Sequence, residues 1–288
     1  MSKVLSSVLL LICLTGPACA VSDKLPAHQN QFSSQVRVGA FNIQSFGRHK
    51  MTLLKTTDHI ITILARYDLV LVQEIRDKSE TAIVELLKKL RSKTGKNYRM
   101  ALSKRLGGGR HKEQLAYLYD SDIFKINYTS SPLDEDDIFY REPFIAKIIH
   151  KFSKSSFVAI GAHVSPKYVA EELEGIYLIA QNISEEWNSH KILVLGDLNA
   201  SCDYITKAEL ANNSLRLNGF VWHIDDSSDT TIHDTNCAYD RIISSKKMGV
   251  HIKSDASVYK FDEKLKLSKA ESIKISDHYP VEILLNFD

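Results

Sequence analysis

Six short polar motifs in this sequence each lie beside an apolar run that has the pattern of a strand. They are Phe41-Asn42-Ile43, Gln73-Glu74-Ile75-Arg76, Gly161-Ala162-His163, Gly196-Asp197-Leu198-Asn199, Cys237-Ala238-Tyr239-Asp240-Arg241 and Ser276-Asp277-His278-Tyr279-Pro280. The motifs are far apart in the chain, but carboxylates, amides and histidines at strand ends indicate one assembled site. Hard oxygen ligands combined with imidazoles suit metal-assisted hydrolysis of a phosphate ester.

The acidic motifs supply candidate ligands for a magnesium ion. Glu74 and Asp197 each follow an apolar run, and either one alone would more simply cap its strand or pair with an arginine. Together with Asn42 and Asp277 they match what Mg²⁺ takes, which is one or two carboxylates, an amide and several waters. We expect Glu74 to be the principal ligand, with Asn42 and Asp277 binding directly or through water.

Two of the eleven histidines, His163 and His278, lie in strand-end motifs and are candidates for proton transfer. A catalytic imidazole needs a carboxylate on its second ring nitrogen, which fixes the tautomer and stabilises the charged form. Glu113 and Asp240 are carboxylates without another evident role. Two His–carboxylate pairs would provide a general base for water and a general acid for the departing 3′ oxygen. The motifs alone leave open which carboxylate serves which histidine.

The N-terminal residues 1–20 have the pattern of a secretory signal peptide. Lys3 supplies the positive charge, residues 4–14 form a short apolar run, and Ala18-Cys19-Ala20 is a small-residue cleavage site. The alternative, a membrane anchor, is disfavoured because the run is too short to span a bilayer and no second long apolar segment follows. We expect cleavage after Ala20, secretion, and no membrane attachment of the mature chain.

The rest of the chain mixes strand and helix patterns without an internal repeat or a linker. The expected strands cover residues 36–41, 68–72, 98–103, 114–119, 123–128, 145–150, 157–163, 191–195, 240–244 and 281–286, and the expected helices cover residues 57–67, 79–93 and 168–189. This mixture favours an α/β fold, a four-layer α/β/β/α sandwich with two packed mixed β-sheets flanked by helices. We expect residues 21–34 to be a flexible extension and residues 35–288 to be a single domain.

The cysteines indicate one disulfide. Signal cleavage would remove Cys13 and Cys19 and leave Cys202 and Cys237. An even count in a secreted chain predicts that these two form a bond, although two buried free thiols would fit the same count.

Glycosylation sequons begin at Asn127, Asn182 and Asn212, and we expect a glycoprotein. Asn199 begins a further sequon, but a glycan there would block the proposed site, so we expect it to be unmodified.

The charge of the chain excludes one class of partner-binding protein. The formal net charge is +2 at pH 7, which is not that of a strongly basic nucleic-acid-binding protein. Any attraction to a polyanion must then come from local arginines and from metal ions. We expect the chain to be a monomer.

In combination and in order, seven segments resemble the deoxyribonuclease I family, within the endonuclease/exonuclease/phosphatase superfamily. They are Ala40 to Gly47, Val72 to Asp77, Tyr140 to Phe144, Gly196 to Ala200, Asp229 to Thr231, Thr235 to Arg241 and Ser276 to Glu282. The resemblance runs from about Val36 to Leu285. It implies a secreted, metal-dependent endonuclease that cuts double-stranded DNA and leaves 5′-phosphate and 3′-hydroxyl ends.

The resemblance also implies how the histidines are paired. The family's first histidine pairs with the glutamate of a Lys-Glu step, here His163 with Glu113. The second pairs with the aspartate after Cys-Ala-Tyr, here His278 with Asp240.

Further roles follow from the same resemblance. Asn42 and Asn199 would hold the scissile phosphate, and Asp197 would orient the water or a metal ion. The residues expected to contact the substrate are Arg76, Arg110, Arg141 and Tyr239. Arginine in a narrow minor groove reads shape rather than base identity, so cutting should depend weakly on sequence.

Structural calcium is implied beside the catalytic Mg²⁺ or Mn²⁺. The matching positions are Asp229, Thr231 and Thr235 in one loop and Asp137, Phe139 and Glu142 in another. His233 replaces a more usual threonine in the first loop, which need not abolish the site because calcium accepts backbone carbonyls. The alternative for each loop is a turn without an ion.

Other substrates and roles remain open at this stage. A phosphodiesterase of the same fold could act on a lipid or a small nucleotide, and a protein without activity could simply bind DNA. Actin binding is not expected, because Met100 and Leu102 occupy the part of the surface where deoxyribonuclease I grips actin and the anchoring tyrosine is absent.

Overall fold

The computed structural model describes residues 35–109, 112–134 and 136–288. The expected signal peptide, the extension over residues 21–34 and Arg110 lie outside these residues. Among the described residues, no helix is long and apolar enough to cross a membrane.

Within the described ranges, twelve strands form two sheets of six strands each. The strands are β1 (Gln35–Phe46), β2 (Leu69–Ile75), β3 (Tyr98–Leu102), β4 (Gln114–Asp120), β5 (Phe124–Ser130), β6 (Phe144–His150), β7 (Ser156–Gly161), β8 (Ile192–Asp197), β9 (Phe220–Trp222), β10 (Asp240–Ser245), β11 (Ser257–Val258) and β12 (Val281–Asn286). The first sheet has the order β11-β12-β1-β2-β4-β3, and the second has the order β5-β6-β7-β8-β10-β9. Both are mixed, because β1–β2 and β7–β8 are parallel pairs while the other pairs are antiparallel.

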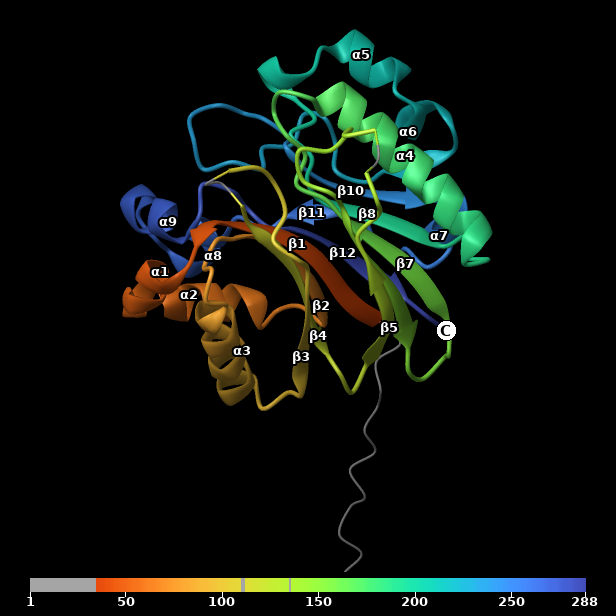
Figure 1. Ribbon diagram of the computed structural model, residues 1–288. Helices are drawn as coiled ribbons and strands as arrows, with labels where there is room; N and C mark the ends of the chain where they lie inside the picture. Colours follow the sequence, from red (N-terminus) through yellow and green to blue (C-terminus); the bar gives the residue numbers. More distant parts are fainter. Residues whose placement is uncertain (1–34, 110–111, 135) are drawn as a thin grey trace, which may run out of the picture. The chain divides into compact units, whose positions relative to one another are not determined.

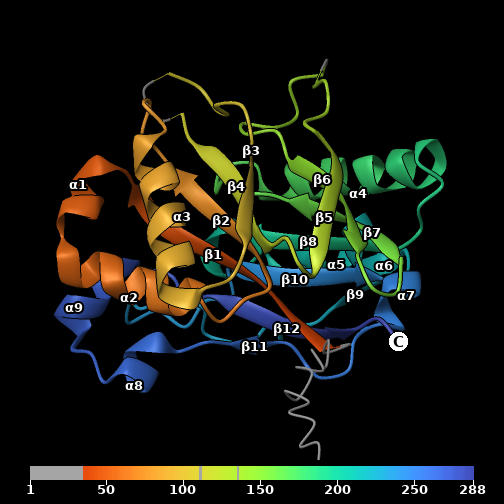
Figure 2. The same cartoon turned by 90° about the horizontal axis from the view of Figure 1, so that it is seen from below.

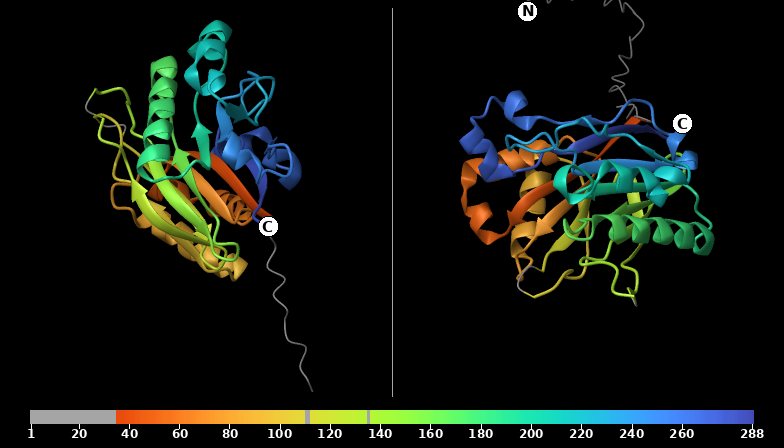
Figure 3. Two further views of the ribbon diagram at one scale, coloured as in Figure 1. Left: turned by 90° about the vertical axis from the view of Figure 1, so that its right-hand side faces the viewer. Right: turned by 90° about the horizontal axis from the view of Figure 1, so that it is seen from above.

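Helices cover the outer face of each sheet (Figures 1 and 3). They are α1 (Arg48–Thr52), α2 (Leu54–Leu64), α3 (Thr81–Thr94), α4 (Val169–Glu186), the 3₁₀ turn η1 (Cys202–Tyr204), α5 (Lys207–Asn212), α6 (Ser214–Leu217), α7 (Lys246–Gly249), α8 (Phe261–Leu265) and α9 (Lys269–Ile275). The long helices α2, α3 and α4 were expected from their apolar spacing. The short helices were not, because so few residues carry little periodicity.

Three apolar cores hold the layers together. Leu71 and Tyr117 of the first sheet meet Ala159 and Leu195 of the second in the central core. Outer cores lie between the first sheet and helices α2 and α3, and between the second sheet and α4. Strands β2, β4 and β8 are buried along their whole length, as expected for strands covered on both faces. The predicted four-layer α/β/β/α sandwich is therefore confirmed.

A close approach of the sheets depends on glycine near the ends of β7 and β8. A Cβ atom at Gly161 would lie 2.7 Å from the Leu71 side chain and 2.8 Å from the Tyr117 hydroxyl. Gly196 has a φ of +134°, and a Cβ there would lie 2.2 Å from the Ala162 carbonyl oxygen. The backbone that precedes Asp197 therefore has a conformation that only glycine adopts readily.

Candidate active site

One edge of the sandwich gathers the polar motifs. Strands β1, β2, β7 and β8 point their carboxyl ends toward this edge. Near these ends, β1 carries Asn42, β2 carries Glu74 and β8 carries Asp197, while His163 follows β7. The antiparallel strands β4, β10 and β12 begin there, which brings in Glu113, Asp240 and His278. Strand direction thus places residues from seven strands around one point.

Glu113 and His163 form the first His–carboxylate pair. The Nδ1 atom of His163 lies 2.5 Å from Oε1 of Glu113, and both side chains are buried. Burial alone would lower the pKa of His163, but the Glu113 carboxylate outweighs it and, with Asp197, raises this pKa above the ordinary value. The contact holds the ring so that Nε2 is the nitrogen presented to the site.

Asp240 and His278 form the second pair. The Nδ1 atom of His278 lies 2.8 Å from Oδ2 of Asp240, and Asp240 is completely buried. Burial disfavours the charged ring, but Asp240 and Asp197 raise the pKa of His278 well above the ordinary value. Burial in turn raises the pKa of Asp240 although His278 opposes this. These two pairings are the ones that the family resemblance implied.

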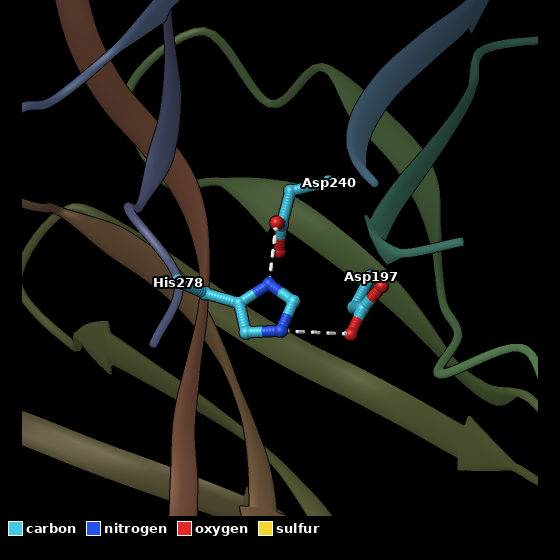
Figure 4. Close-up of side chains that lie close together, drawn as sticks. All are labelled: Asp197, Asp240 and His278. Carbon is cyan, nitrogen blue, oxygen red and sulfur yellow. Dashed lines mark hydrogen bonds and ion pairs between the residues drawn. The ribbon is translucent and has the colours of Figure 1, made fainter. Parts of the chain in front are cut away.

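Asp197 lies between the two imidazoles. Its Oδ2 atom is 3.5 Å from Nε2 of His163 and 3.6 Å from Nε2 of His278. Figure 4 shows His278 with Asp240 on one ring nitrogen and Asp197 beyond the other. The same Oδ2 atom accepts a hydrogen bond of 3.1 Å from the Asn42 amide. Two rings that can transfer protons therefore face a single carboxylate oxygen.

Asn42 links Asp197 to Glu74. The Asn42 amide nitrogen donates to Oε1 of Glu74 at 3.2 Å, and Glu74 Oε2 accepts from the Ser45 backbone at 2.8 Å. Burial alone would raise the pKa of Glu74, but His163, Arg76 and these hydrogen bonds lower it. Glu74 therefore stays ionised, as a ligand for a hard cation must.

The composition of the site fits a bound cation. Within the described residues, five carboxylates converge here, whereas the basic side chains near them are Lys50, Arg76 and Arg141. One oxygen each of Glu113, Asp240 and Asp277 is buried without a hydrogen-bond partner. Unpaired buried carboxylate oxygens are costly unless something positive approaches them. The donors are oxygen atoms of the kind that Mg²⁺ and Mn²⁺ prefer.

Two separate sets of residues could hold this cation. The expected set was Asn42, Glu74 and Asp277. Ligand atoms of Asp197, Asp240 and His278 lie within 4.8 Å of one another and form a second set. The sequence did not point to this second set as ligands, because Asp240 and His278 were expected to form a His–carboxylate pair and Asp197 to orient the water or a metal ion.

Asn199 and Arg141 support the loop that carries His163. The Asn199 amide donates to the Val164 carbonyl at 2.9 Å. Arg141 is buried, and its Nε donates to the His163 carbonyl at 2.9 Å. The structure therefore places Arg141 beneath the site, and its expected contact with DNA stays a prediction.

Arg76 and Tyr239 stand at the rim. The Arg76 guanidinium lies 2.8 Å from Glu74 Oε2 and is 37% exposed, so it can still reach a ligand. Tyr239 stacks on Tyr204 with ring centroids 5.1 Å apart, and burial raises its pKa to about 12. Both positions suit contact with substrate.

The first candidate calcium loop has the geometry of a closed turn. Asp229 Oδ1 accepts from the Thr231 backbone at 3.1 Å, and the Thr231 hydroxyl donates to the Thr235 carbonyl at 2.9 Å. His233, the residue that departs from the family pattern, points its Nε2 toward Asp277 Oδ2 at 3.7 Å.

The second candidate calcium loop is also internally bonded. Asp134 accepts from the backbone of Ile138 and Phe139, and Glu142 pairs with Lys104 at 2.8 Å. Asp137 is exposed, with a φ of +52°. Calcium binding by either loop therefore remains a prediction.

Four positioning residues were not identified from the sequence, namely Gln73, Thr230, Lys50 and Ser276. Gln73 crosses between the sheets, since its amide donates to the Ala162 carbonyl at 2.9 Å and accepts from the Asp197 backbone at 3.1 Å. Thr230 accepts from the Asp240 backbone at 3.1 Å. Gln73 directly precedes Glu74, and this adjacency was the available signal.

Lys50 and Ser276 link the carboxyl-terminal half of β1 to the end of α9. Lys50 Nζ donates to the carbonyls of Ile43, Gln44 and Ile275 at 2.6–2.9 Å. Burial lowers the pKa of Lys50 to about 8, against the pull of nearby carboxylates. The Ser276 hydroxyl donates to the Asn42 carbonyl at 2.6 Å.

The predicted disulfide is present between Cys202 and Cys237, which excludes two free thiols. Among the sequon asparagines, Asn127, Asn182 and Asn212 are exposed, whereas Asn199 is buried. Exposure agrees with the expected pattern of glycosylation but does not test it.

Comparison with known proteins identifies the family. Residues 39–278 match the endonuclease/exonuclease/phosphatase family model. Mouse deoxyribonuclease-1-like 2 is 35% identical over 87% of this chain and 92% of its own length. Pig deoxyribonuclease-1 is 33% identical over 88% of this chain and 93% of its own length.

Solved structures agree on the fold. A humanised TDP2 from D. rerio superposes with a TM-score of 0.62 at 15% identity, covering 88% of this chain and 100% of its own. The human Nocturnin catalytic domain gives 0.61 at 16% identity, covering 89% of this chain and 96% of its own. The fold and the sequence relationships together show that the chain belongs to the deoxyribonuclease I family of the endonuclease/exonuclease/phosphatase superfamily.

Proposed function

We propose that the protein is a secreted, divalent-metal-dependent endonuclease that hydrolyses double-stranded DNA with little sequence specificity. The observation that carries this proposal is the placement of two imidazoles, each with its own carboxylate, on either side of Asp197 Oδ2. Membership of a family whose similar relatives are named deoxyribonucleases supports DNA as the substrate.

The two pairs suit the two proton transfers of phosphodiester hydrolysis. One imidazole takes the proton of a water that attacks phosphorus in line, and the other donates a proton to the departing 3′ oxygen. Either histidine suits either role, since each has a carboxylate on Nδ1 and directs Nε2 toward Asp197 at the centre of the site. Hydrolysis in this direction leaves a 5′-phosphate and a 3′-hydroxyl.

The neighbouring groups would hold the phosphate and its charge. Asn42 and Asn199 present amides at the site, and donors placed in advance stabilise charge that develops on a phosphoryl oxygen. Glu74, Asn42 and Asp277, or the set of Asp197, Asp240 and His278, would hold Mg²⁺ or Mn²⁺. A bound divalent ion would neutralise negative charge on the scissile phosphate.

The remaining features extend the proposal. Arg76 and Tyr239 at the rim, with Arg141 beneath it, would contact a DNA backbone or minor groove. Residues 1–20 would direct the chain to secretion, the two loops near Asp229 and Asp137 would bind calcium, and the mature chain would act as a monomer.

The direct test uses supercoiled plasmid with magnesium and calcium. We expect nicked circles that a DNA ligase reseals without prior kinase treatment, because ligase needs a 5′-phosphate beside a 3′-hydroxyl. Sphingomyelin hydrolysis, measured with the same preparation, should be negligible. Faster turnover of sphingomyelin than of plasmid would assign the site to another phosphodiester, and nicks that ligase cannot seal would contradict the proposed chemistry.

A further inference from the structure

A basic groove lies at the end of the sandwich away from the candidate active site. It opens between β3 and β5, which are edge strands of the two different sheets (Figure 2). Its volume is about 660 Å³. Four cationic side chains line it, namely Arg91, Arg99, Lys125 and Lys151, against one acidic side chain, Asp122.

The charges of the groove are not neutralised within the protein. Among the described residues, none of the four cations has a carboxylate within ion-pair distance. Arg91 and Lys151 donate to the backbone carbonyls of Tyr98 and Ser121, which orients them without cancelling charge. Beside the groove, by contrast, Lys96 forms an ion pair with Asp68 at 2.9 Å.

The groove is too far from the candidate active site to share its ligand. Strand β4 runs from beside Glu113 to Asp120, and Tyr119 near its end lines the groove. At about 3.4 Å per residue, the six residue steps from Glu113 to Tyr119 separate the two regions by roughly 20 Å. A phosphate held near His163 therefore cannot touch Arg99 or Lys125.

The lining favours recognition of anionic groups rather than of bases. The rings of Tyr98, Tyr119 and Phe124 at the groove are buried, so they offer no open face on which bases could stack. Specific protein–DNA interfaces mostly bury about 1,000–2,500 Å² of protein surface and so extend well beyond one groove between two edge strands. A slim, linear polyanion without bases can lie inside it.

We propose that this groove binds a sulfated polysaccharide of the heparin type. The guanidinium and ammonium groups of Arg91, Arg99, Lys125 and Lys151 line the groove, and several cations in one groove match the repeated sulfate groups of such a chain. The site would retain the protein on polyanionic surfaces while its catalytic edge stays free. This inference is independent of the nuclease assignment.

The test measures binding of a fluorescent heparin octasaccharide by anisotropy at several salt concentrations. Charge reversal with Arg99→Glu and Lys125→Glu together should weaken binding by roughly tenfold or more and make its salt dependence shallower, because fewer counterions are released. The matched control, Lys88→Glu with Lys264→Glu, reverses two exposed charges outside the groove. Equal melting temperatures would verify that both double variants are folded, and plasmid nicking should be unchanged in both.

Two results would overturn the proposal. The first is an unchanged octasaccharide affinity in the groove variant, which would place the polysaccharide elsewhere, including at the catalytic edge. The second is displacement of the octasaccharide by a phosphorothioate DNA duplex or by single-stranded DNA at lower concentration than by unlabelled octasaccharide. That outcome would assign the groove to nucleic acid.

Discussion

Ser276 donates its hydroxyl to the carbonyl of Asn42, a residue 234 positions earlier in the chain, at 2.6 Å. The same hydroxyl accepts from the His278 backbone at 3.1 Å. The Ser276 side chain therefore sets the distance between Asn42, whose amide donates to Asp197, and His278, whose imidazole faces Asp197.

Replacement of Ser276 by alanine should disturb catalysis more than stability. We expect the kcat for plasmid nicking to fall roughly tenfold, because small displacements of reacting groups strongly lower the rate of the chemical step. The free energy of unfolding should fall by about 1 kcal/mol, the usual worth of a hydrogen bond. Ser272→Ala is the control, since Ser272 is also buried but its hydroxyl donates to the carbonyl of Ser268, the residue that precedes α9, and not to a residue of the site. Equal losses of kcat in both variants would contradict a positioning role for Ser276.

This relationship also shows what the sequence could and could not reveal. The strand-end motifs predicted the sheet edge where Glu74, His163 and Asp197 meet, since apolar runs end just before them. The pairing of His163 with Glu113 came from family resemblance, because no local pattern relates two residues 50 positions apart. Ser276 and Lys50 were missed because their partners are backbone carbonyls, which leave no trace in side-chain types.

Plasmid nicking should require a divalent ion, and loss of a carboxylate that binds this ion should raise the ion concentration that nicking needs. Chelation should abolish plasmid nicking, and added Mg²⁺ should restore it. Asp277→Asn should raise the Mg²⁺ concentration for half-maximal activity by roughly tenfold, because it removes a charged carboxylate whose buried Oδ1 accepts no hydrogen bond from the protein. Asp255→Asn, a change at an exposed position, should leave the requirement unaltered. An unchanged requirement in Asp277→Asn would remove Asp277 from the ligand set.

Glu172 should make stability depend on pH. Its carboxylate accepts from the backbone of Tyr140 and Ser165, and burial raises its pKa from 4.5 to about 7. Between these values the folded protein retains a proton that the unfolded chain has released. The free energy of unfolding should therefore fall as pH rises from about 4.5 to 7, by on the order of 3 kcal/mol.

Urea unfolding of Glu172→Gln at several pH values tests this directly. The glutamine does not titrate, so the decline between pH 5 and pH 7 should be much smaller than in the parent protein. Glu171→Gln, at an exposed neighbouring position, should follow the parent. Parallel curves for Glu172→Gln and the parent would show that this carboxylate is ionised throughout.

The disulfide should contribute to stability rather than to chemistry. Cys202 and Cys237 are 35 positions apart, and a loop of this length corresponds to roughly 3–4 kcal/mol in the chain-entropy model. The double variant Cys202→Ser/Cys237→Ser should lose about this free energy of unfolding in urea. At a temperature where it is folded, its kcat should stay close to that of the parent. If the double variant and the parent had equal free energies of unfolding, the disulfide would not stabilise the protein by restricting the unfolded chain.

The central claim is that His163 and His278 act on a DNA phosphate beside Asp197. The most direct measurement is the rate of supercoiled plasmid nicking in Mg²⁺ and Ca²⁺ by His163→Ala, His278→Ala and the control His59→Ala. We predict that each of the first two falls by about a hundredfold to ten-thousandfold, as loss of a general acid or base does, while the control keeps the parent's rate. If folded His163→Ala and His278→Ala proteins nick plasmid as fast as the parent, this account of the site is wrong.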